Sequence, residues 1–214
     1  MDVFVFEHFS AMTDDDGSLR HEGTAMRDAL VDDFQRLDGL QVHTMDAADA
    51  PGGQRPALFR THCERADLAI VVAPETDGLL EDYLHTARRH VPGLLNATTE
   101  VVAWASDKRR TAEQLAAVGI PTPGTEGPPW ICKPVDGAGG DGVRLTLDPA
   151  DRAQLAPGMR LESFHRGIPS SMSILMASDG PRLLPPLRQH CRSGTFAYAR
   201  GSLWNDDQVS ERLV

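Results

Sequence analysis

The sequence has few cysteines and no excess of positive charge. Its three cysteines, Cys63, Cys132 and Cys191, lie far apart and form no Cys-x-x-Cys pair. The chain therefore lacks the ligand spacing of a structural zinc site and is typical of a reducing compartment. Acidic residues outnumber Lys and Arg by 31 to 21, which gives a formal net charge of −10 at pH 7. This balance argues against nucleic acid and anionic membranes as partners.

Long apolar runs and several familiar motifs are also missing. No run approaches the roughly 20 apolar residues of a membrane-spanning helix. The N-terminal residues MDVFVFEHF lack the basic start of a signal peptide, and the eight histidines include no HExxH zinc motif. With 41% hydrophobic and 24% charged residues, the composition is that of a soluble globular protein. We therefore expect a cytoplasmic protein.

The most informative stretch covers residues 129–147, where a glycine-rich turn separates two strand-like segments. The first segment ends at Lys133. The glycines are Gly137, Gly139, Gly140 and Gly142. After them, Val143, Leu145 and Leu147 alternate with polar residues, as expected of a half-buried strand. Glycine permits positive φ and a close approach of backbone N–H groups to a ligand. The stretch predicts a phosphate-covering loop, with a flexible hairpin as the alternative.

Two well-known glycine motifs do not fit this stretch. A Rossmann fingerprint and a P-loop both place their glycines between a strand and a helix, and the P-loop ends in Gly-Lys-Ser/Thr. Here a strand-like segment follows the glycines, and Lys133 precedes them. The first predicted strand also has no GxGxxG after it, which opposes a dinucleotide-binding oxidoreductase. That function is kept as a remote alternative.

The first hundred residues alternate between strand and helix patterns. The strand-like runs are 2–7, 40–45, 67–73 and 93–96, and the helical runs are 22–37, 58–65 and 78–89. One face of the first helix is expected to be buried because its apolar residues recur at three-and-four spacing. These residues are Met26, Ala29, Leu30, Phe34 and Leu37. The alternation predicts an open α/β sheet with right-handed parallel crossovers, over a domain of residues 1–97.

After residue 97 the pattern changes to short helices, extended segments and hairpins. Helices are expected at 98–105 and 107–118, and strands at 159–163, 171–177 and 182–188. Ser106 is the expected N-cap of the second helix, because a serine hydroxyl can accept a hydrogen bond from the first turn. Lys108 lies in that first turn.

In this order, the pieces resemble the ATP-grasp superfamily. The segments that carry the resemblance are Ser106-Asp107-Lys108, Gly119-Ile120-Pro121-Thr122-Pro123, Lys133-Pro134, the glycine-rich loop and Leu161-Glu162-Ser163-Phe164. The chain looks most like the branch that includes tyramine–glutamate ligase and the pyrrolysine-pathway ligase. The segments similar to that branch are Glu7, Glu22-Gly23-Thr24-Ala25-Met26, Ala73-Pro74-Glu75, Arg188-Gln189, Tyr198 and Gly201.

The resemblance implies an ATP-dependent carboxylate–amine ligase. In that family ATP phosphorylates a carboxylate, and an amine attacks the acyl phosphate to form an amide. The implied cofactors are ATP and Mg²⁺. The implied partners are a small-molecule carboxylate and an amine, with an amino-acid-like substrate. A homodimer is left open. The implied fold is a Rossmann-like pre-ATP-grasp sheet (1–97), an α+β ATP-grasp nucleotide-binding lobe (98–180) and the start of the C-terminal lobe (181–214).

Family roles transfer to individual residues. Lys108 and Lys133 become nucleotide-binding cations, on the α/β-phosphates and near the purine. The resemblance places one loop over the β/γ-phosphates, namely Gly137, Gly139, Gly140, Asp141 and Gly142. The resemblance implies a hinge at Glu162, Ser163 and Phe164, whose main chain would meet the adenine edge. Arg188, and secondarily Arg200, would contact the transferred phosphoryl group, with solvated surface charge as the alternative.

The sequence departs from the family pattern at two places. Ile168-Pro169-Ser170 stand where many ATP-grasp proteins have a ribose-binding glutamate. The family's magnesium carboxylates and terminal Glu-x-Asn motif come after the point where this sequence ends, and Asp206, Asp207 and Glu211 do not form that motif. We therefore expect an incomplete catalytic lobe, with no metal ligand assigned in these residues. A non-catalytic nucleotide-binding or interaction protein derived from the fold is the alternative function.

Overall fold

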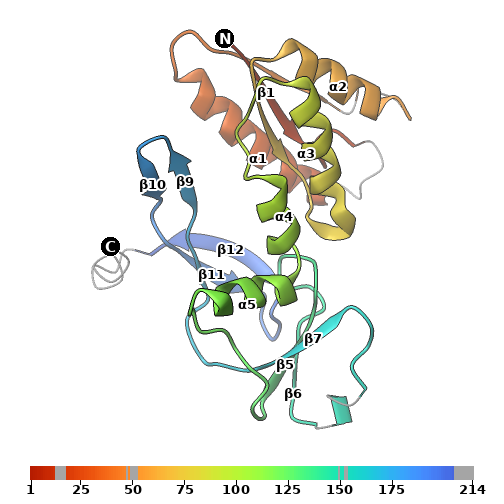
Figure 1. Ribbon diagram of the computed structural model, residues 1–214, viewed down its shortest axis with the longest axis vertical. Coiled ribbons are helices and arrows are strands. Elements are labelled where there is room, and N and C mark those ends of the chain that lie inside the picture. The colour runs from red at the N-terminus through yellow and green to blue at the C-terminus, as the bar shows by residue number, and fades with distance from the viewer. Residues whose placement is uncertain (13–17, 47, 49–52, 149, 152–153, 205–214) are drawn as a thin grey trace. The chain divides into compact units, whose positions relative to one another are not determined.

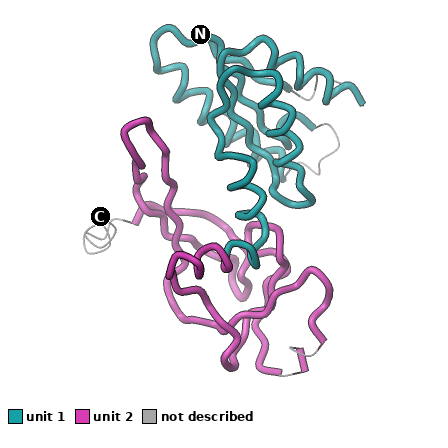
Figure 2. Tube along the Cα trace, viewed as in Figure 1, with its two compact units in different colours: residues 1–111 teal, residues 112–214 magenta. Residues whose placement is uncertain are grey.

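The computed structural model describes residues 1–12, 18–46, 48, 53–148, 150–151 and 154–204 (Figure 1). Asp206, Asp207 and Glu211 lie outside these residues. The chain divides into two compact units, residues 1–111 and 112–214 (Figure 2). The predicted division into three parts, at residues 97 and 180, stays a prediction. No helix in the described part of the chain is long and apolar enough to cross a membrane.

The first unit is built on a four-stranded parallel sheet. Its strands are β1 (Asp2–Glu7), β2 (Gln41–Thr44), β3 (Leu68–Val72) and β4 (Gly93–Leu94). Its helical elements are α1 (Ser18–Gln35), α2 (Arg55–Arg65), η2 (Thr76–Gly78), α3 (Leu79–His90), α4 (Thr99–Ala105) and the start of α5 (Lys108–Ala117). The strand order is β2-β1-β3-β4, and every pair is parallel. The predicted open α/β sheet is confirmed.

The main core of the first unit lies where the sheet meets α2 and α3. Phe4 and Phe6 of β1 pack with Phe59 of α2 and Leu84 of α3, and all four are fully buried. The rings of Phe6 and Phe59 are 4.8 Å apart in an edge-on arrangement. Such aromatic pairs add about 0.5–1.5 kcal/mol beyond the effect of buried area. The core therefore holds β1 and the chain that follows it in a fixed position.

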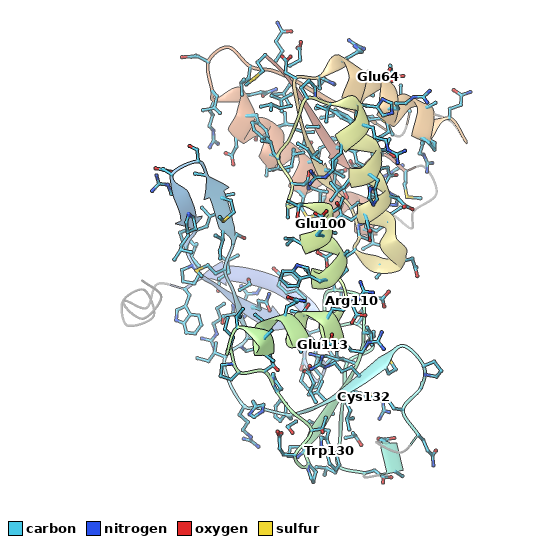
Figure 3. The ribbon with its side chains drawn as sticks, in the orientation of Figure 1. Glu64, Glu100, Arg110, Glu113, Trp130 and Cys132 are labelled. Atoms are coloured by element: carbon cyan, nitrogen blue, oxygen red, sulfur yellow. The ribbon has the colours of Figure 1, made fainter. Side chains whose placement is uncertain are left out.

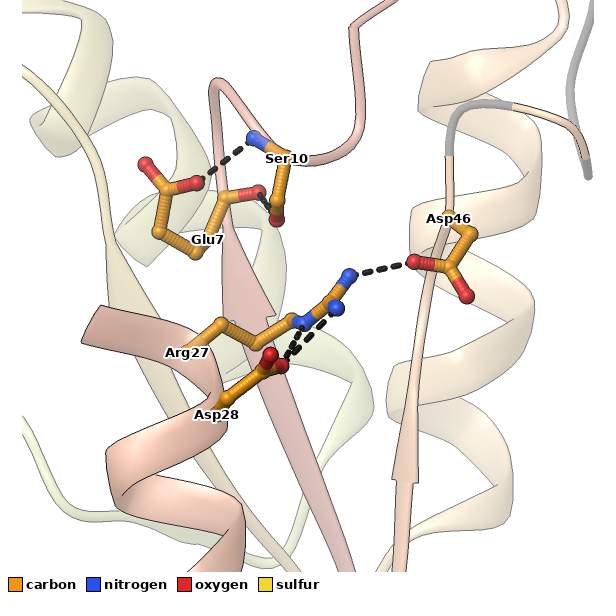
Figure 4. Close-up of polar contacts among 5 residues, drawn as sticks. All are labelled: Glu7, Ser10, Arg27, Asp28 and Asp46. Atoms are coloured by element: carbon orange, nitrogen blue, oxygen red, sulfur yellow. Dashed lines mark hydrogen bonds and ion pairs between the residues drawn. The ribbon is translucent and has the colours of Figure 1, made fainter. Parts of the chain in front are cut away.

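A buried carboxylate closes the turn after β1. The Glu7 carboxylate accepts hydrogen bonds from the backbone N–H groups of Phe9 (3.0 Å) and Ser10 (2.6 Å), and Figure 4 shows the bond to Ser10. Gly23 of α1 lies directly against this carboxylate, because a Cβ atom added to Gly23 would be 2.2 Å from Glu7 Oε2. The close approach of helix and carboxylate therefore requires glycine at position 23.

The predicted buried face of α1 is wrong in part: Leu30 and Phe34 are half-buried, but Ala29 is exposed. Met26 and Leu37 are exposed, while Gly23 is buried and Arg27 is largely covered. The guanidinium of Arg27 pairs with Asp28 and with Asp46, which follows β2 (Figure 4). The helix is turned so that Gly23 meets Glu7 and Arg27 reaches Asp46. Those contacts, rather than the apolar spacing alone, set its rotation.

The start of α5 corrects a second expectation. Ser106 is not its N-cap, because the Ser106 hydroxyl donates to the carbonyl of Val102, in the preceding helix (2.8 Å). Asp107 takes that role: its Oδ1 accepts from the backbone N–H groups of Arg109 (2.8 Å) and Arg110 (3.3 Å). A carboxylate is an equally good cap and also suits the positive end of the helix dipole.

The second unit consists mainly of antiparallel strands. They are β5 (Trp130–Pro134), β6 (Arg144–Thr146), β7 (Met159–Ser163), β8 (Ser170–Ser171), β9 (Ile174–Ala177), β10 (Gly180–Leu183), β11 (Leu187–Cys191) and β12 (Tyr198–Leu203). Two three-stranded sheets have the orders β6-β5-β7 and β12-β11-β8, and β9 and β10 form a separate hairpin. This α+β arrangement agrees with the predicted ATP-grasp domain.

The sheet β6-β5-β7 has one apolar and one polar face. Trp130 and Cys132 project from β5 (Figure 3) and pack with Leu161 of β7 in a small core. The alternate residues, Ile131 and Lys133, project to the opposite face, as strand geometry requires. The polar face is the one that borders the site described below.

The strand β6 is present, but the prediction of which of its residues are buried is wrong. Thr146 is buried, whereas Leu145 and Leu147 are exposed. Pairing of Trp130 with Thr146 places the threonine on the apolar side of the sheet. Its hydroxyl donates to the carboxylate of Asp151 (2.5 Å), so the buried polar atom has a partner. That hydrogen bond allows a polar residue to be buried, although the sequence pattern predicted that Leu145 and Leu147 would be the buried residues.

Candidate functional site

The second unit contains a cavity of about 840 Å³. Most of its walls come from the strand β5, the glycine-rich loop (137–142), the hinge segment with the residues that follow it (162–169) and the end of β11 with the turn into β12 (189–198), and Pro123 and Val143 complete them. Pockets that bind small ligands are roughly 300–1,000 Å³. The cavity is therefore large enough for a nucleotide-sized molecule, and all of its walls belong to one compact unit.

The floor of the cavity carries a buried carboxylate between two cations. Glu162 is 8% exposed. Its Oε2 lies 2.5 Å from Lys133 Nζ, and its Oε1 lies 2.7 Å from Arg160 Nε. The β5–β7 register explains this cluster: Ile131 is paired with Glu162 and Lys133 with Arg160, so these side chains share one face of the sheet.

The glycine-rich loop needs glycine for its backbone conformation. The φ angles are 91° at Gly137, 70° at Gly139, 77° at Gly140 and 69° at Gly142. L-residues rarely adopt this region, whereas glycine enters it at little steric cost. Consecutive residues of this kind can direct N–H groups toward an anion. The predicted glycine turn between two strands is present, and its role in covering phosphates stays a prediction.

The main chain of the hinge segment is partly occupied by internal hydrogen bonds. The N–H of Ser163 donates to Gly124 O (2.7 Å), and that of Phe164 donates to Pro129 O (2.8 Å). These bonds position the segment rigidly on the wall of the cavity. These two N–H groups are therefore already paired, and the predicted main-chain contact of the hinge with adenine stays a prediction.

The other predicted residues lie elsewhere. Lys108 begins α5 in the first unit, so its part in a nucleotide site stays a prediction. Arg188 and Arg200 are exposed on β11 and β12. Pairing of Arg200 with His190, and of Arg188 with Ser202, places both arginines on the face opposite Gln189, a residue of the cavity wall. Their proposed phosphoryl contact also stays a prediction.

Sequence reasoning missed two parts of the site. Arg160 could have been found, because it stands two residues before Glu162 in a predicted strand and must share its face. Phe196 could not, because its contacts with Gly140 and Phe164 join segments that are far apart in the chain. Ile168 and Pro169, which stand where many ATP-grasp proteins have a ribose-binding glutamate, line the cavity.

The polar groups at the cavity suit an anionic nucleotide. Among the described residues, no group of three or more His, Cys, Asp or Glu side chains is placed to hold a metal ion. A nucleotide fits better: Lys133 supplies a cation, the loop supplies glycine amides, and Glu162 supplies a hydrogen-bond acceptor. We therefore assign no magnesium ligand.

Comparisons with known proteins point to one family. The family model of the pre ATP-grasp 3 domain matches residues 24–102, and that of an ATP-grasp domain matches residues 105–211. Two curated relatives are 3-methyl-D-ornithine–L-lysine ligases, from Methanosarcina acetivorans (31% identity) and Methanosarcina mazei (32% identity). Each match covers 78 residues, or 36% of this chain. It spans only 22% and 21% of the respective ligases.

Solved structures with the same fold are more distant in sequence. An ATP-grasp superfamily protein from Archaeoglobus fulgidus matches 99% of this chain and 68% of its own, with a TM-score of 0.70 and 20% identity. The ATP complex of D-alanine–D-alanine ligase from Bacillus anthracis matches 100% of this chain and 74% of its own, with a TM-score of 0.64 and 14% identity. At these identities the likeness establishes the fold.

Proposed function

The chain belongs to the ATP-grasp family, and on that premise we propose that it binds ATP in the second-unit cavity and takes part in ATP-dependent carboxylate–amine ligation. The observation that carries the proposal is the convergence of Lys133, Glu162 and the glycine-rich loop on one cavity. The two curated relatives are ligases by name, which supports the reaction class. The identity of the two substrates is not part of the proposal.

Lys133 and Glu162 form a donor and an acceptor that suit adenine. Adenine presents an acceptor, N7, next to a donor, the N6 amino group, whereas guanine presents two acceptors, N7 and O6. Lys133 Nζ would face N7, and Glu162 would accept from the N6 amino group. A guanine in the same position would bring O6 against the Glu162 carboxylate, which is unfavourable. The pair therefore favours ATP over GTP.

The glycine-rich loop would cover the phosphates. Backbone N–H groups in the left-handed region can converge on an anion, and the loop borders the same cavity as Lys133. In the proposed reaction the γ-phosphoryl group moves from ATP to a carboxylate, and the amine then displaces phosphate from the acyl phosphate. Preorganised donors lower the barrier because they offset the charge on the transferring group.

Two measurements test the proposed function. ATP should bind the protein in isothermal titration calorimetry, and Lys133→Ala should weaken binding by about 1.5–3 kcal/mol, the range for hydrogen bonds to charged groups. Arg182→Ala is the matched control, because Arg182 pairs with Asp179 on the exposed β9–β10 hairpin, away from the cavity walls. ADP release should require both a carboxylate and an amine. ATP binding without such release would support the non-catalytic alternative, and absence of binding would contradict the proposal.

A further inference from the structure

The glycine-rich loop rests on a neighbouring turn, residues 192–198, which we call the docking turn. A Cβ atom added to Gly140 would lie 2.1 Å from the carbonyl oxygen of Phe196 and 2.8 Å from its carbon. One residue earlier, Gly139 O accepts a hydrogen bond from the N–H of Tyr198 (2.6 Å). The two backbones are therefore in direct contact, and no side chain could be placed between them.

The docking turn is a rigid support. The N–H of Arg192 donates to Ala197 O (2.8 Å), and the N–H of Thr195 donates to Arg192 O (3.0 Å). The Thr195 hydroxyl oxygen accepts from the N–H of Ala197 (3.2 Å). Because these bonds close the turn on itself, its carbonyl at Phe196 is held in a fixed direction.

Phe196 also contacts a second segment of the cavity wall. Its ring packs edge-on against Phe164, with centroids 6.3 Å apart and an interplanar angle of 71°. Phe164 belongs to the hinge segment, where its N–H is bonded to Pro129 O. Phe196 thus touches the glycine-rich loop with its carbonyl and the hinge segment with its ring. Gly140, Phe164 and Phe196 all line the cavity.

We propose that Phe196 is a positioning residue that holds the glycine-rich loop closed over the nucleotide. Together with the Tyr198 N–H it forms a latch between the loop and the hinge segment. Position 140 then requires glycine because a side chain would collide with the Phe196 carbonyl, in addition to any requirement set by a bound phosphate. A nucleotide enters or leaves when the loop leaves the docking turn, so the latch sets both rates. The inference rests on the proposed nucleotide site.

Gly139 and Gly140 provide a matched pair of variants. Their φ angles are 70° and 77°, so alanine brings similar backbone strain at both positions. Around Gly139 nothing lies within 4 Å of an added Cβ, whereas at Gly140 it meets the Phe196 carbonyl. In the nucleotide-free protein, Gly140→Ala should speed hydrogen exchange at the Tyr198 amide by about tenfold relative to Gly139→Ala, because the contact must open. Equal exchange in the two variants would overturn the latch.

Nucleotide kinetics test the role of the Phe196 ring. Phe196→Ala keeps the backbone carbonyl that meets Gly140 but removes the ring that holds the docking turn to Phe164. The turn and the loop should then move apart more often, which should raise both the association and the dissociation rate constants of ATP about tenfold, while Kd changes less than either rate. Phe196→Tyr should restore the wild-type rates. Gly158→Ala, in a turn outside the cavity with φ of 77° and open space for a Cβ, controls for general strain. A change in the dissociation rate alone would contradict the latch.

The two proposals can fail separately. If the wild-type protein binds no ATP although the Tyr198 amide is protected, the proposed function fails, and the role of the latch in nucleotide exchange fails with it. If ATP binds but Gly140→Ala and Phe196→Ala leave exchange and rates unchanged, only the latch is refuted. Both experiments use the protein of residues 1–214.

Discussion

The Nζ atom of Lys133 lies 2.5 Å from Oε2 of Glu162, on the polar face of the β6-β5-β7 sheet. The same carboxylate is bonded to Arg160 through its other oxygen. This arrangement holds Lys133 and Glu162 in one orientation before any ligand is present. A preorganised donor and acceptor lose little conformational entropy on binding, which favours selection between similar ligands.

We expect the Lys133–Glu162 pair to select adenine. Glu162→Gln should weaken ATP binding by about 1–3 kcal/mol, the usual discrimination by a good pair of hydrogen bonds. GTP should lose less or gain, because the glutamine amide can donate to guanine O6. Calorimetric titrations with both nucleotides give the ATP:GTP ratio. Equal losses of binding free energy for ATP and GTP would mean that Lys133 and Glu162 do not distinguish adenine from guanine.

We expect the ion pair between Arg160 and Glu162 to contribute to the stability of the second unit. Removal of one partner from a buried ion pair costs roughly 3–5 kcal/mol. Arg160→Ala should therefore lower the free energy of unfolding of the second unit by a large fraction of that amount, since Lys133 still pairs with Glu162. Urea unfolding measures the change. The exposed pair of Arg182 and Asp179 is the control, and Arg182→Ala should cost less than about 1 kcal/mol. Similar losses of unfolding free energy in Arg160→Ala and Arg182→Ala would argue that the Lys133–Glu162–Arg160 cluster is solvated.

The cap of α5 gives a prediction with a pH dependence. Asp107→Ala should destabilise the helix by about 0.5–2 kcal/mol, whereas Ser106→Ala should cost less because Ser106 does not cap it. The side-chain hydrogen bond from Arg109 lowers the pKa of Asp107 below its ordinary value of 3.8. A lowered folded-state pKa gives stability that is present above the unfolded pKa and lost as pH falls through the folded pKa. The difference between wild type and Asp107→Ala should therefore disappear well below pH 4, as unfolding curves at a series of pH values would show.

We expect the first unit to lose stability in mild acid because of a histidine in an aromatic stack. His43 and His62 both stack on Phe4, with centroids 5.3 and 4.9 Å away. Burial lowers the pKa of His43 below its ordinary value of 6.5, and the charge of Arg65 lowers it further. The charge of Asp2 and a hydrogen bond with the backbone of His62 raise it, but the net shift is downward. The unfolded chain thus binds a proton at higher pH than the folded chain. Stability should fall as pH drops below about 6.5 and through the folded pKa.

The variant His43→Phe tests this dependence because it keeps an aromatic ring on Phe4 and removes the titrating group. It should reduce the loss of unfolding free energy between pH 7 and pH 5. Some loss should remain, since burial also lowers the pKa of His8. An unchanged slope in His43→Phe would show that another group causes the acid sensitivity.

The strands of the first unit could be predicted because continuous apolar runs such as 68–72 are local signals. The glycine turn between two strand-like segments was accessible because glycine spacing is also a local signal. The shared face of Lys133 and Glu162 was not predicted, because it depends on the register of β5 and β7. The rotation of α1 was not accessible either, since it depends on Glu7 and Asp46, which lie outside the helix. The contact between Gly140 and Phe196 was equally inaccessible, because a glycine required by a distant carbonyl looks the same in sequence as one required by a ligand.

Gly23 offers a test of how rigidly the turn after β1 is built. Alanine is favoured over glycine inside a helix by about 1 kcal/mol, so Gly23→Ala would stabilise an isolated α1. In the folded protein the new Cβ would lie 2.2 Å from Glu7 Oε2. A flexible side chain could move away, but the Glu7 carboxylate is bonded to the N–H groups of Phe9 and Ser10. We therefore expect Gly23→Ala to lower the unfolding free energy by about 1–3 kcal/mol, as overpacking does.

The matched control for Gly23→Ala is Gly127→Ala, because an added Cβ at Gly127 has no atom within 4 Å. The double variant Glu7→Ala/Gly23→Ala completes a cycle: without the carboxylate, alanine at position 23 should cost much less than it does in the wild-type background. Urea unfolding of the four proteins measures this coupling. If Gly23→Ala is neutral, or if its cost is the same with and without Glu7, the carboxylate is not fixed in the way its two hydrogen bonds indicate.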